Sequence, residues 1–255
     1  MNKDNTPLIS IIIPIYNAAP KAKLCIDAIK AQTYKNLKVL LVDDGSTDGT
    51  GDICRLAEKK DSRFSYIRID HAGVSAARNA GIDAVSGKYA LFLDCDDAFA
   101  TKHSIEDMVN VIDRNVDFDI LVGNYIQKRN DKIPETIVHG FDMDEDTDSY
   151  QFRFEAFFVK GHASRIWGKL YRIDFLREHN IRFINLDFGE DMLFNFYCYA
   201  NRPKYLFVND KFYIYHKSSD GILSIYRPDM DRTWLNIAMH FERYIRSLGD
   251  HPEDL

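Results

Sequence analysis

Residues 89–100 read YALFLDCDDAFA. An apolar run from Tyr89 to Leu93 passes directly into Asp94, Asp96 and Asp97. The run is typical of a buried strand, yet neighbouring carboxylates repel one another and are costly to remove from water. A hard divalent cation such as Mg²⁺ or Mn²⁺ would offset both costs, because these ions prefer oxygen ligands. On this stretch alone, a solvated acidic turn before a helix is the competing interpretation.

The sequence on the N-terminal side of this stretch predicts strands and helices in alternation. The continuous, β-branched run at 8–15 predicts a strand buried on both faces, and an amphipathic segment after it predicts a helix. The expected strands are Leu8–Ile15, Leu37–Val42, Phe64–Ile69 and Tyr89–Leu93; the expected helices are 19–32, one from Thr47 or Asp48 to about Lys60, and 73–84. This alternation predicts an α/β fold with a mostly parallel, doubly wound sheet flanked by helices.

Polar residues follow three of these expected strands. They are Tyr16 and Asn17, then Asp43 and Asp44, and finally the acidic stretch at 94–97. Ligands of parallel α/β sheets bind outside the carboxyl ends of the strands, and all three groups fall at such ends. The fold therefore gathers them on one edge, where the acidic stretch is positioned like a binding site.

The second half of the chain alternates less clearly. We expect helices at 105–114, 153–159 and 191–200, strands at 118–124 and 205–215, and a loop or exposed hairpin at 130–149. Residues 230–248 place apolar side chains at helical spacing with arginines between them, which predicts an amphipathic terminal helix. The sequence has no internal repeat or Gly/Ser-rich linker, so this half is expected to be a subdomain on the same sheet.

The composition is that of a soluble globular protein, with 255 residues of which 45% are hydrophobic and 28% charged. A formal net charge of -6 argues against general nucleic-acid binding, which needs a basic surface. The four cysteines are too scattered for a metal-binding pair or a disulfide scaffold. No apolar run resembles a signal peptide or spans a bilayer, so we expect a cytoplasmic protein.

Five motifs, in this order, resemble the signature of family 2 glycosyltransferases with the GT-A fold. They are SIIIPIYN at 10–17, VDDGSTD at 42–48, GVSAARNAG at 73–81, LDCDD at 93–97 and ED at 190–191. The resemblance is dense over 8–97 and continues thinly to about residue 224. It implies a Rossmann-like nucleotide-sugar-binding half at 1–100 and an acceptor-binding half at 101–255, which ends in the helix at about 230–248.

The resemblance also implies residues that bind the nucleotide-sugar donor. Pro14, Tyr16 and Asn17 would line the nucleotide pocket, with the Tyr16 ring available to stack on the base. Asp44 would accept a hydrogen bond from a uracil-type imide, which implies a UDP-sugar. Arg78 would pair with phosphate or with one of the carboxylates. The competing structural interpretations are an acidic pair at a helix N-terminus for Asp44 and its neighbour, and a salt bridge for Arg78.

The LDCDD motif implies the metal site. Alternation along an extended segment would put Asp94 and Asp96 on the same side. By resemblance, Asp94 faces the ribose or diphosphate, and Asp96 binds Mn²⁺ or Mg²⁺ with Asp97 as neighbour or second ligand. His216 would touch the diphosphate or the metal, although a structural histidine is an equally good interpretation.

The ED motif implies the catalytic base. In the family, the aspartate corresponding to Asp191 removes the proton from the acceptor hydroxyl as this attacks the anomeric carbon, and the configuration inverts. A helix-capping role is the alternative. The implied acceptor is a glycan or a lipid-linked molecule in bacterial surface polysaccharide synthesis. Trp167 could stack on an acceptor sugar or pack in the core. The arginines of the terminal helix would allow peripheral contact with the inner face of a membrane, against the simpler interpretation of a packed helix.

Two other protein classes also place aspartates after strands. A haloacid-dehalogenase-type phosphatase would use Asp94 as a nucleophile, but the order of the motifs here fits it poorly. A phosphoacceptor receiver domain would not need the leading strand Leu8–Ile15 or the additional length. A degenerate glycosyltransferase that only binds nucleotide is disfavoured by the intact Asp94, Asp96 and Asp191.

Overall fold

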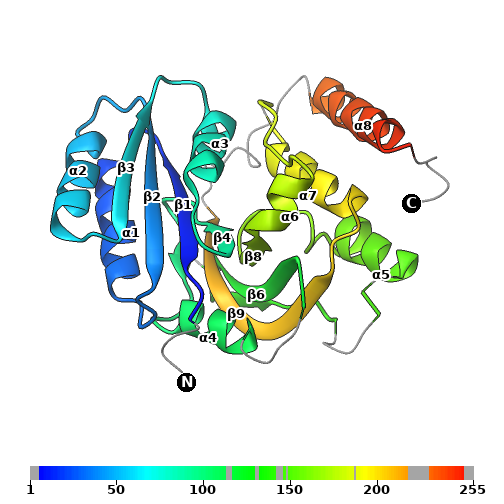
Figure 1. The fold of residues 1–255 in the computed structure, drawn as a ribbon, viewed down its shortest axis with the longest axis horizontal. Helices are drawn as coiled ribbons and strands as arrows, with labels where there is room; N and C mark the ends of the chain where they lie inside the picture. Colours follow the sequence, from blue (N-terminus) through cyan, green and yellow to red (C-terminus); the bar gives the residue numbers. More distant parts are fainter. Residues whose placement is uncertain are drawn as a thin grey trace.

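Figure 1 shows an α/β molecule built on a curled sheet with helices on both faces. The computed structural model describes residues 6–112, 117–129, 132–141, 146–147, 149–186, 188–217 and 230–249. Within them the strands are β1 (Ile9–Ile15), β2 (Leu37–Asp44), β3 (Phe64–Ile69), β4 (Tyr89–Phe92), β5 (Ala98–Phe99), β6 (Ile120–Arg129), β7 (Glu135–Ile137), β8 (Lys169–Arg172) and β9 (Tyr205–Lys217). The helices are α1 (Ala19–Lys30), α2 (Thr50–Lys60), α3 (Val74–Ala84), α4 (Ser104–Ile112), α5 (Tyr150–Phe154), the π-helical turn η2 (Glu155–Val159), α6 (Ile173–Glu178), α7 (Glu190–Ala200) and α8 (Met230–Ser247).

The strands form a single sheet in the order β3-β2-β1-β4-β8-β6-β9-β5, with β7 paired to β6 outside this path. Strands β1 to β4 pair in parallel, as the alternation of strands and helices predicted. Strand β8 then pairs antiparallel with β4 and β6, whereas β6 and β9 pair in parallel. The second half of the chain thus continues the sheet of the first half, in mixed orientation.

Hydrophobic cores lie on both faces of this sheet. In β1, Ile11 and Ile13 face a core shared with α1, α2 and α4, whereas Ile12 faces a core shared with α3, α5, α6 and α7. Successive side chains of a strand point to opposite faces, so a strand covered on both sides is apolar at nearly every position. This is why the run at 8–15 lacks the alternation of a half-exposed strand.

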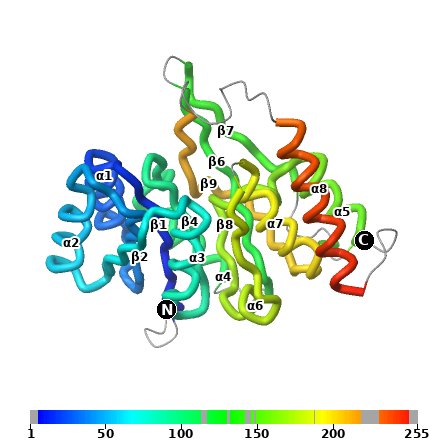
Figure 2. Tube along the Cα trace, turned by 90° about the horizontal axis from the view of Figure 1, so that it is seen from above, coloured from blue at the N-terminus to red at the C-terminus, as the bar shows by residue number. Residues whose placement is uncertain are grey.

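Of the two alternatives expected at 130–149, a loop or an exposed hairpin, the structure has a hairpin, and the predicted terminal helix is also present. Strand β7 pairs antiparallel with β6, which gives the hairpin expected within 130–149, although residues 130–131, 142–145 and 148 lie outside the described residues. Helix α8 packs on α7, where the Phe241 ring stacks on Phe196 with centroids 3.6 Å apart. Figure 2 shows α8 far from α1 and α2, at the opposite end of the molecule. Among the described residues, none of the helices has the length and apolar character needed to cross a bilayer.

Helix α3 lies unusually close to the central strand β1. A Cβ atom at Gly81 would overlap Cγ2 of Ile12 and lie 3.2 Å from its Cγ1. Glycine is therefore required here by close approach, although it weakens a helix interior. The close contact sets the position of the preceding turn of α3, which carries Arg78.

We expect Gly81→Ala to lower the free energy of unfolding by about 1–3 kcal/mol, because the overpacking outweighs the gain in helix propensity. Urea denaturation measures this change. In an Ile12→Ala background, which removes the overlapping atoms, the same substitution should cost much less. An equal cost in both backgrounds would show that the contact with β1 is not the reason for the glycine.

Candidate functional site

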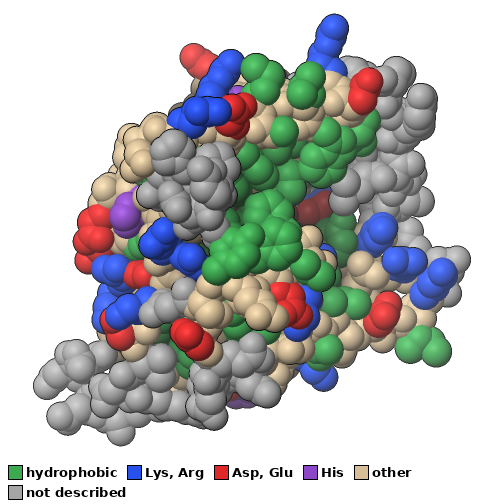
Figure 3. Space-filling model, turned by 90° about the vertical axis from the view of Figure 1, so that its right-hand side faces the viewer, with side chains coloured by type: hydrophobic (Ala, Val, Ile, Leu, Met, Phe, Trp, Pro, Cys, Tyr) green, Lys and Arg blue, Asp and Glu red, His purple; other side chains and the backbone are tan. Residues whose placement is uncertain are grey.

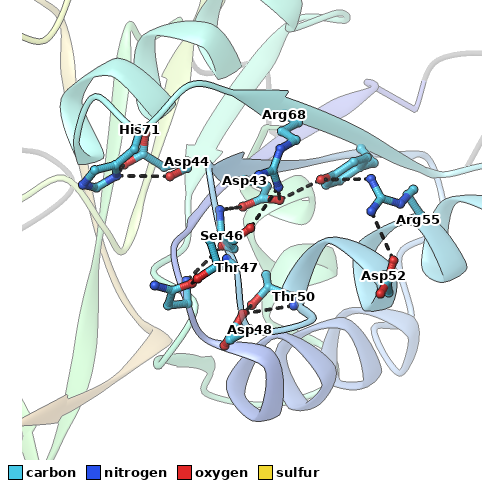
Figure 4. Close-up of polar contacts among 12 residues, drawn as sticks. Asp43, Asp44, Ser46, Thr47, Asp48, Thr50, Asp52, Arg55, Arg68 and His71 are labelled. Atoms are coloured by element: carbon cyan, nitrogen blue, oxygen red, sulfur yellow. Dashed lines mark hydrogen bonds and ion pairs between the residues drawn. The ribbon is translucent and has the colours of Figure 1, made fainter.

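Figure 4 shows the polar contacts at the carboxyl end of β2, where Asp43 is completely buried. Its carboxylate accepts hydrogen bonds from the Ser46 N–H (2.8 Å) and the Tyr66 hydroxyl (2.7 Å), and it pairs with Arg68 (2.9 Å). Burial alone would raise the pKa of Asp43, but the hydrogen bonds from Ser46 and Tyr66 outweigh it and hold this pKa below its ordinary value. Asp43 therefore stabilises the turn after β2.

The neighbouring Asp44 holds the loop between β3 and α3. Its carboxylate accepts hydrogen bonds from the backbone N–H groups of Ala72 (2.8 Å) and Gly73 (2.9 Å), and it contacts Nδ1 of His71 (2.9 Å). The His71 ring stacks on the Tyr16 ring, with centroids 4.2 Å apart. Asp43 and Asp44 are the last residues of β2, so the interpretation as a helix N-terminal acidic pair is wrong.

Tyr16 and His71 therefore form a ring pair beside Asp44, at the edge where we predicted the nucleotide pocket. Tyr16 is 48% exposed, so one part of its ring is available to a ligand. The sequence analysis missed His71, since a lone histidine before the GVSAARNAG motif follows no pattern. Its proximity to that motif is the only signal that could have drawn attention to it.

Asn17 and Asp48 connect the ends of β1 and β2. The Asn17 side-chain oxygen accepts a hydrogen bond from the Thr47 N–H (2.8 Å), and the Asn17 backbone N–H donates to the Ser46 hydroxyl (2.9 Å). Asp48 accepts hydrogen bonds from the N–H groups of Thr50 and Ala19, both at 3.1 Å. Asp48 thus serves the first turn of α2, although Gly49 occupies the N-cap position. These contacts fix the walls of the predicted nucleotide pocket; Pro14 lies in β1 opposite Val42.

A buried guanidinium joins the two halves of the chain. Arg78 of α3, only 3% exposed, pairs with Asp94 (3.1 Å), Glu190 (2.9 Å) and Asp191 (2.6 Å). We call these four residues the Arg78 centre. Burial lowers the pKa of Arg78, but the three carboxylates outweigh it, so the guanidinium stays charged. Arg78 therefore does form the salt bridges that we considered as its structural interpretation; its contact with phosphate stays a prediction.

The predicted base, Asp191, lies in the first turn of α7. The N-cap position belongs to Gly189, which has a φ of 82°, and the Asp191 carboxylate pairs with Arg78. Desolvation raises the pKa of Asp191 above the ordinary range of a carboxyl; the Arg78 charge opposes this shift, and the Glu190 charge adds to it. A raised pKa suits a general base, which is most effective when its pKa lies near the working pH.

Buried polar groups hold the start of α7 in place. The Asn195 side chain donates a hydrogen bond to the Asp191 carbonyl (2.8 Å) and accepts one from the Tyr171 hydroxyl (2.9 Å). Beside it, the buried amine of Lys169 donates to the carbonyl groups of Ala163 and Arg165. Burial lowers the pKa of Lys169 well below its ordinary value. Strand β8 and helix α7 are thereby joined behind the base.

The LDCDD motif forms a turn, so the extended conformation that we expected for it is wrong. Residues 95 and 96 are a turn, which the Asp97 N–H closes by donating to the Asp94 carbonyl (3.0 Å). Asp94 contacts Arg78, whereas Asp96 is half-exposed and pairs with Lys21 of α1 (3.1 Å). Asp94 and Asp96 are thus kept apart, since each pairs with a different cation.

Strand β9 holds the third carboxylate of this motif. Asp97 is buried and accepts hydrogen bonds from the Tyr213 hydroxyl (2.7 Å) and the His216 N–H (2.8 Å). Burial raises the pKa of Asp97 to about 7. The Tyr213 hydroxyl also accepts a hydrogen bond from the Asp94 N–H (3.3 Å), and Nδ1 of His216 lies 3.7 Å from Asp97. Asp97 and Tyr213 thus fasten the turn to β9.

Asp96 is the carboxylate best suited to a divalent cation. Exposed salt bridges such as the one between Asp96 and Lys21 contribute little to stability, so a divalent cation could replace the lysine. Both oxygens of Asp97 already accept hydrogen bonds. In the part of the chain that the structure describes, no three His, Cys, Asp or Glu side chains form a group that could hold a metal. The donor set therefore fits an ion bound by one or two carboxylates and completed by substrate oxygens and water.

Trp167 packs in an aromatic cluster beside this turn. Its ring stacks on Tyr213 (4.9 Å between centroids) and Tyr215 (5.2 Å), and meets Tyr125 edge-on (4.7 Å). Core packing is thus at least part of its role, and its stacking on an acceptor sugar stays a prediction.

Comparisons with known proteins agree with this geometry. The family model described as "Glycosyl transferase family 2" matches residues 10–177. The chain belongs to this family. Among curated relatives, glycosyltransferases GlyA and GlyG of Streptococcus pneumoniae are 31% and 30% identical over 91% and 89% of this chain. The chain spans 32% of the length of GlyA and 75% of that of GlyG.

Solved glycosyltransferase structures share the fold. TarS of S. aureus (residues 1–349), in complex with UDP-GlcNAc, superposes with a TM-score of 0.71 at 22% identity, over 91% of this chain and 66% of that one. Mannosyltransferase PcManGT of Pyrobaculum calidifontis, in complex with GDP-Man and Mn²⁺, superposes with a TM-score of 0.64 at 18% identity, over 95% and 65%. The predicted GT-A-type fold is confirmed. The family match leaves the phosphatase and receiver interpretations without support; the strand order β3-β2-β1-β4 also differs from that of a receiver.

For this glycosyltransferase-family chain we expect Arg78→Met to lower the free energy of unfolding by about 3–5 kcal/mol, because it leaves three neighbouring carboxylates without their cation. Urea denaturation at neutral pH measures this loss. Adding Asp191→Asn should recover part of it, since one of the repelling charges is then removed. If the double variant is no more stable than Arg78→Met alone, repulsion within the Arg78 centre is not the cause.

Proposed function

We propose that the chain transfers a sugar, with inversion, from a UDP-sugar to a hydroxyl of a glycan or lipid-linked acceptor in the synthesis of a bacterial surface polysaccharide. The observation that carries this proposal is the Arg78 centre. One guanidinium holds Asp94, at the predicted donor edge of the sheet, together with Asp191, the candidate base. Family membership and the complex of TarS with UDP-GlcNAc support the reaction class and the choice of uridine.

In this proposal the nucleotide binds at the carboxyl ends of β1 and β2. The uracil ring stacks against Tyr16, whose ring also meets that of His71. The imide N–H of the uracil donates to Asp44 in place of the exposed His71 ring, while the hydrogen bonds from Ala72 and Gly73 stay. The diphosphate then extends toward the turn that carries Asp94 and Asp96. Pro14 and Asn17 line the pocket without reacting, because their role is to hold its walls.

The chemical step is a single displacement. Asp191 accepts the proton of the acceptor hydroxyl while the acceptor oxygen bonds to the anomeric carbon, on the face opposite the diphosphate. The bond from the anomeric carbon to the diphosphate oxygen breaks at the same time, and UDP leaves with the electron pair. Arg78 orients Asp191 through its 2.6 Å contact. Glu190 shares the same guanidinium nitrogen and adds to the basicity of Asp191.

A divalent cation, Mn²⁺ or Mg²⁺, would supply Lewis-acid neutralisation of the charge on the departing diphosphate. Asp96 would hold it, while Asp97 keeps the turn on β9 and His216 lies beside Asp97. This assignment is a proposal, supported by the half-exposed Asp96 carboxylate and by the Mn²⁺ in the PcManGT complex.

We expect UDP to bind more tightly when Mn²⁺ is added, and Asp96→Asn to abolish this gain. Isothermal titration of UDP with and without the ion measures both affinities. Lys21→Gln is the matched control, since it removes the partner of Asp96 and leaves the carboxylate, so its metal effect should persist. Equal UDP affinity with and without the ion in the unmodified protein would refute the metal assignment.

Asp191→Asn should lower sugar transfer by ~10²-fold or more, the scale for loss of a general base. UDP affinity should stay unchanged, because Asp191 serves the acceptor. In the unmodified protein kcat/KM should rise with pH through a pKa above the ordinary aspartate range, because only the ionised carboxylate accepts a proton. The transfer rates are measured as the release of UDP. The donor is the UDP-sugar that raises the melting temperature of the protein most in a thermal-shift screen. If Asp191→Asn instead transfers sugar at a near-normal rate but has a lowered melting temperature, Asp191 has a structural role and is not the base.

A further inference from the structure

A hollow lies between the first half of α8 and the segment that leads into α7. Its volume is about 520 Å³, within the range of small-molecule sites. Its lining residues are Asn185, Leu186, Arg232, Thr233, Leu235, Asn236 and Met239. Of these, the sequence analysis considered only Arg232, as one of the arginines of the terminal helix that would allow contact with a membrane.

This hollow borders both parts of the proposed reaction site. The Asn185 side-chain oxygen lies 3.5 Å from the place that a Cβ on Gly73 would occupy, and the Gly73 N–H donates to Asp44. On the other side, Gly189 follows Leu186 in the sequence and lies so near α8 that a Cβ on it would be 2.6 Å from Cδ1 of Ile237; Asp191 comes shortly after it in α7. A ligand in the hollow would therefore lie next to the segment that positions the base.

One part of the hollow is suited to an anion. Arg232 is exposed, and its guanidinium forms no ion pair with any side chain in the described ranges. The amides of Asn185 and Asn236 add further hydrogen-bond donors. Asp231 is the acidic neighbour, and its carboxylate accepts a hydrogen bond from the Arg232 N–H (2.9 Å), so it partly opposes the positive charge.

The other part of the hollow is apolar and partly exposed. Leu235 is 63% exposed and Met239 is 40% exposed, and Leu186 lines the same hollow. Figure 3 shows hydrophobic side chains gathered on the face of the molecule where α8 and α5 lie, with basic and acidic side chains both present at the margins. Exposed apolar surface beside an accessible guanidinium, here that of Arg232, is typical of sites for amphipathic, negatively charged ligands.

We propose that this hollow binds the acceptor through a phosphate group that is joined to a hydrocarbon chain. The phosphate contacts Arg232 and Asn236, and the first carbons of the chain cover Leu235 and Met239. Guanidinium and phosphate form charge-assisted hydrogen bonds, whereas a neutral glycan would leave Arg232 unpaired and the leucine and methionine exposed. The inference rests on the proposed sugar transfer, since it selects the lipid-phosphate class from the acceptors considered there.

The test uses dodecyl phosphate as the probe, at concentrations below micelle formation, with binding measured by isothermal titration. It should bind more tightly than either inorganic phosphate or dodecyl glucoside, because only it carries both groups. Arg232→Gln should lower the affinity for dodecyl phosphate by about tenfold or more, the scale of a lost hydrogen bond to a charged group. The affinity for dodecyl glucoside should stay unchanged. Leu235→Gln should lower the affinity for both dodecyl compounds and leave the affinity for inorganic phosphate unchanged.

Arg243→Gln is the matched control, because Arg243 is an exposed arginine on the same helix that does not line the hollow. It should bind dodecyl phosphate as the unmodified protein does. Equal weakening by Arg243→Gln and Arg232→Gln would mean that the probe adsorbs to the charged surface of α8, and the proposal would be wrong. The proposal would also be wrong if the unmodified protein bound dodecyl phosphate no more tightly than inorganic phosphate. UDP binding by the unmodified protein is measured separately, and its absence would count against the proposed sugar transfer instead.

Discussion

The structure depends on one buried charge, the guanidinium of Arg78. Removing an arginine from water is costly, and its attraction to carboxylates repays that cost only when the geometry is good. Here the partners come from two distant segments, Asp94 after β4 and the Glu190–Asp191 pair at the start of α7. The N-terminal and C-terminal halves of the sheet must therefore both be folded before Arg78 can form all three ion pairs. The close packing of Gly81 against Ile12 fixes the position of α3 relative to β1, and with it the position of Arg78.

The carboxylates along the sheet edge have different roles because their surroundings differ. Asp43 and Asp44 are adjacent, yet Asp43 stabilises a turn while Asp44 holds the loop that carries His71. Asp96 and Asp97 are also adjacent, yet Asp96 is half-exposed beside Lys21, while Asp97 is buried under Tyr213. An acidic cluster that looks uniform in the sequence thus separates into carboxylates fixed by the fold and carboxylates left accessible to ligands.

The sequence was sufficient to predict the parallel half of the fold, because its strands are rich in apolar residues and β1, β2 and β3 are each followed by a helix. It also placed the polar residues on one edge, since parallel strands end together. It could not predict the pairing of β8 with β4 and β6, which is non-local and leaves no periodic signal. Nor could it predict the turn at 95–96 or the contact of Arg78 with Glu190 and Asp191. Such contacts depend on tertiary packing, and so does the stacking of His71 on Tyr16.

The central claim is that Arg78 holds a single base opposite the donor, so that transfer occurs in one displacement. The most direct measurement is the configuration of the sugar first released when the protein slowly hydrolyses an α-linked UDP-sugar, followed by proton NMR before the anomers equilibrate. The account predicts the β anomer as the first product in the unmodified protein, and no enzymatic release from Asp191→Asn. Initial release of the α anomer would contradict it.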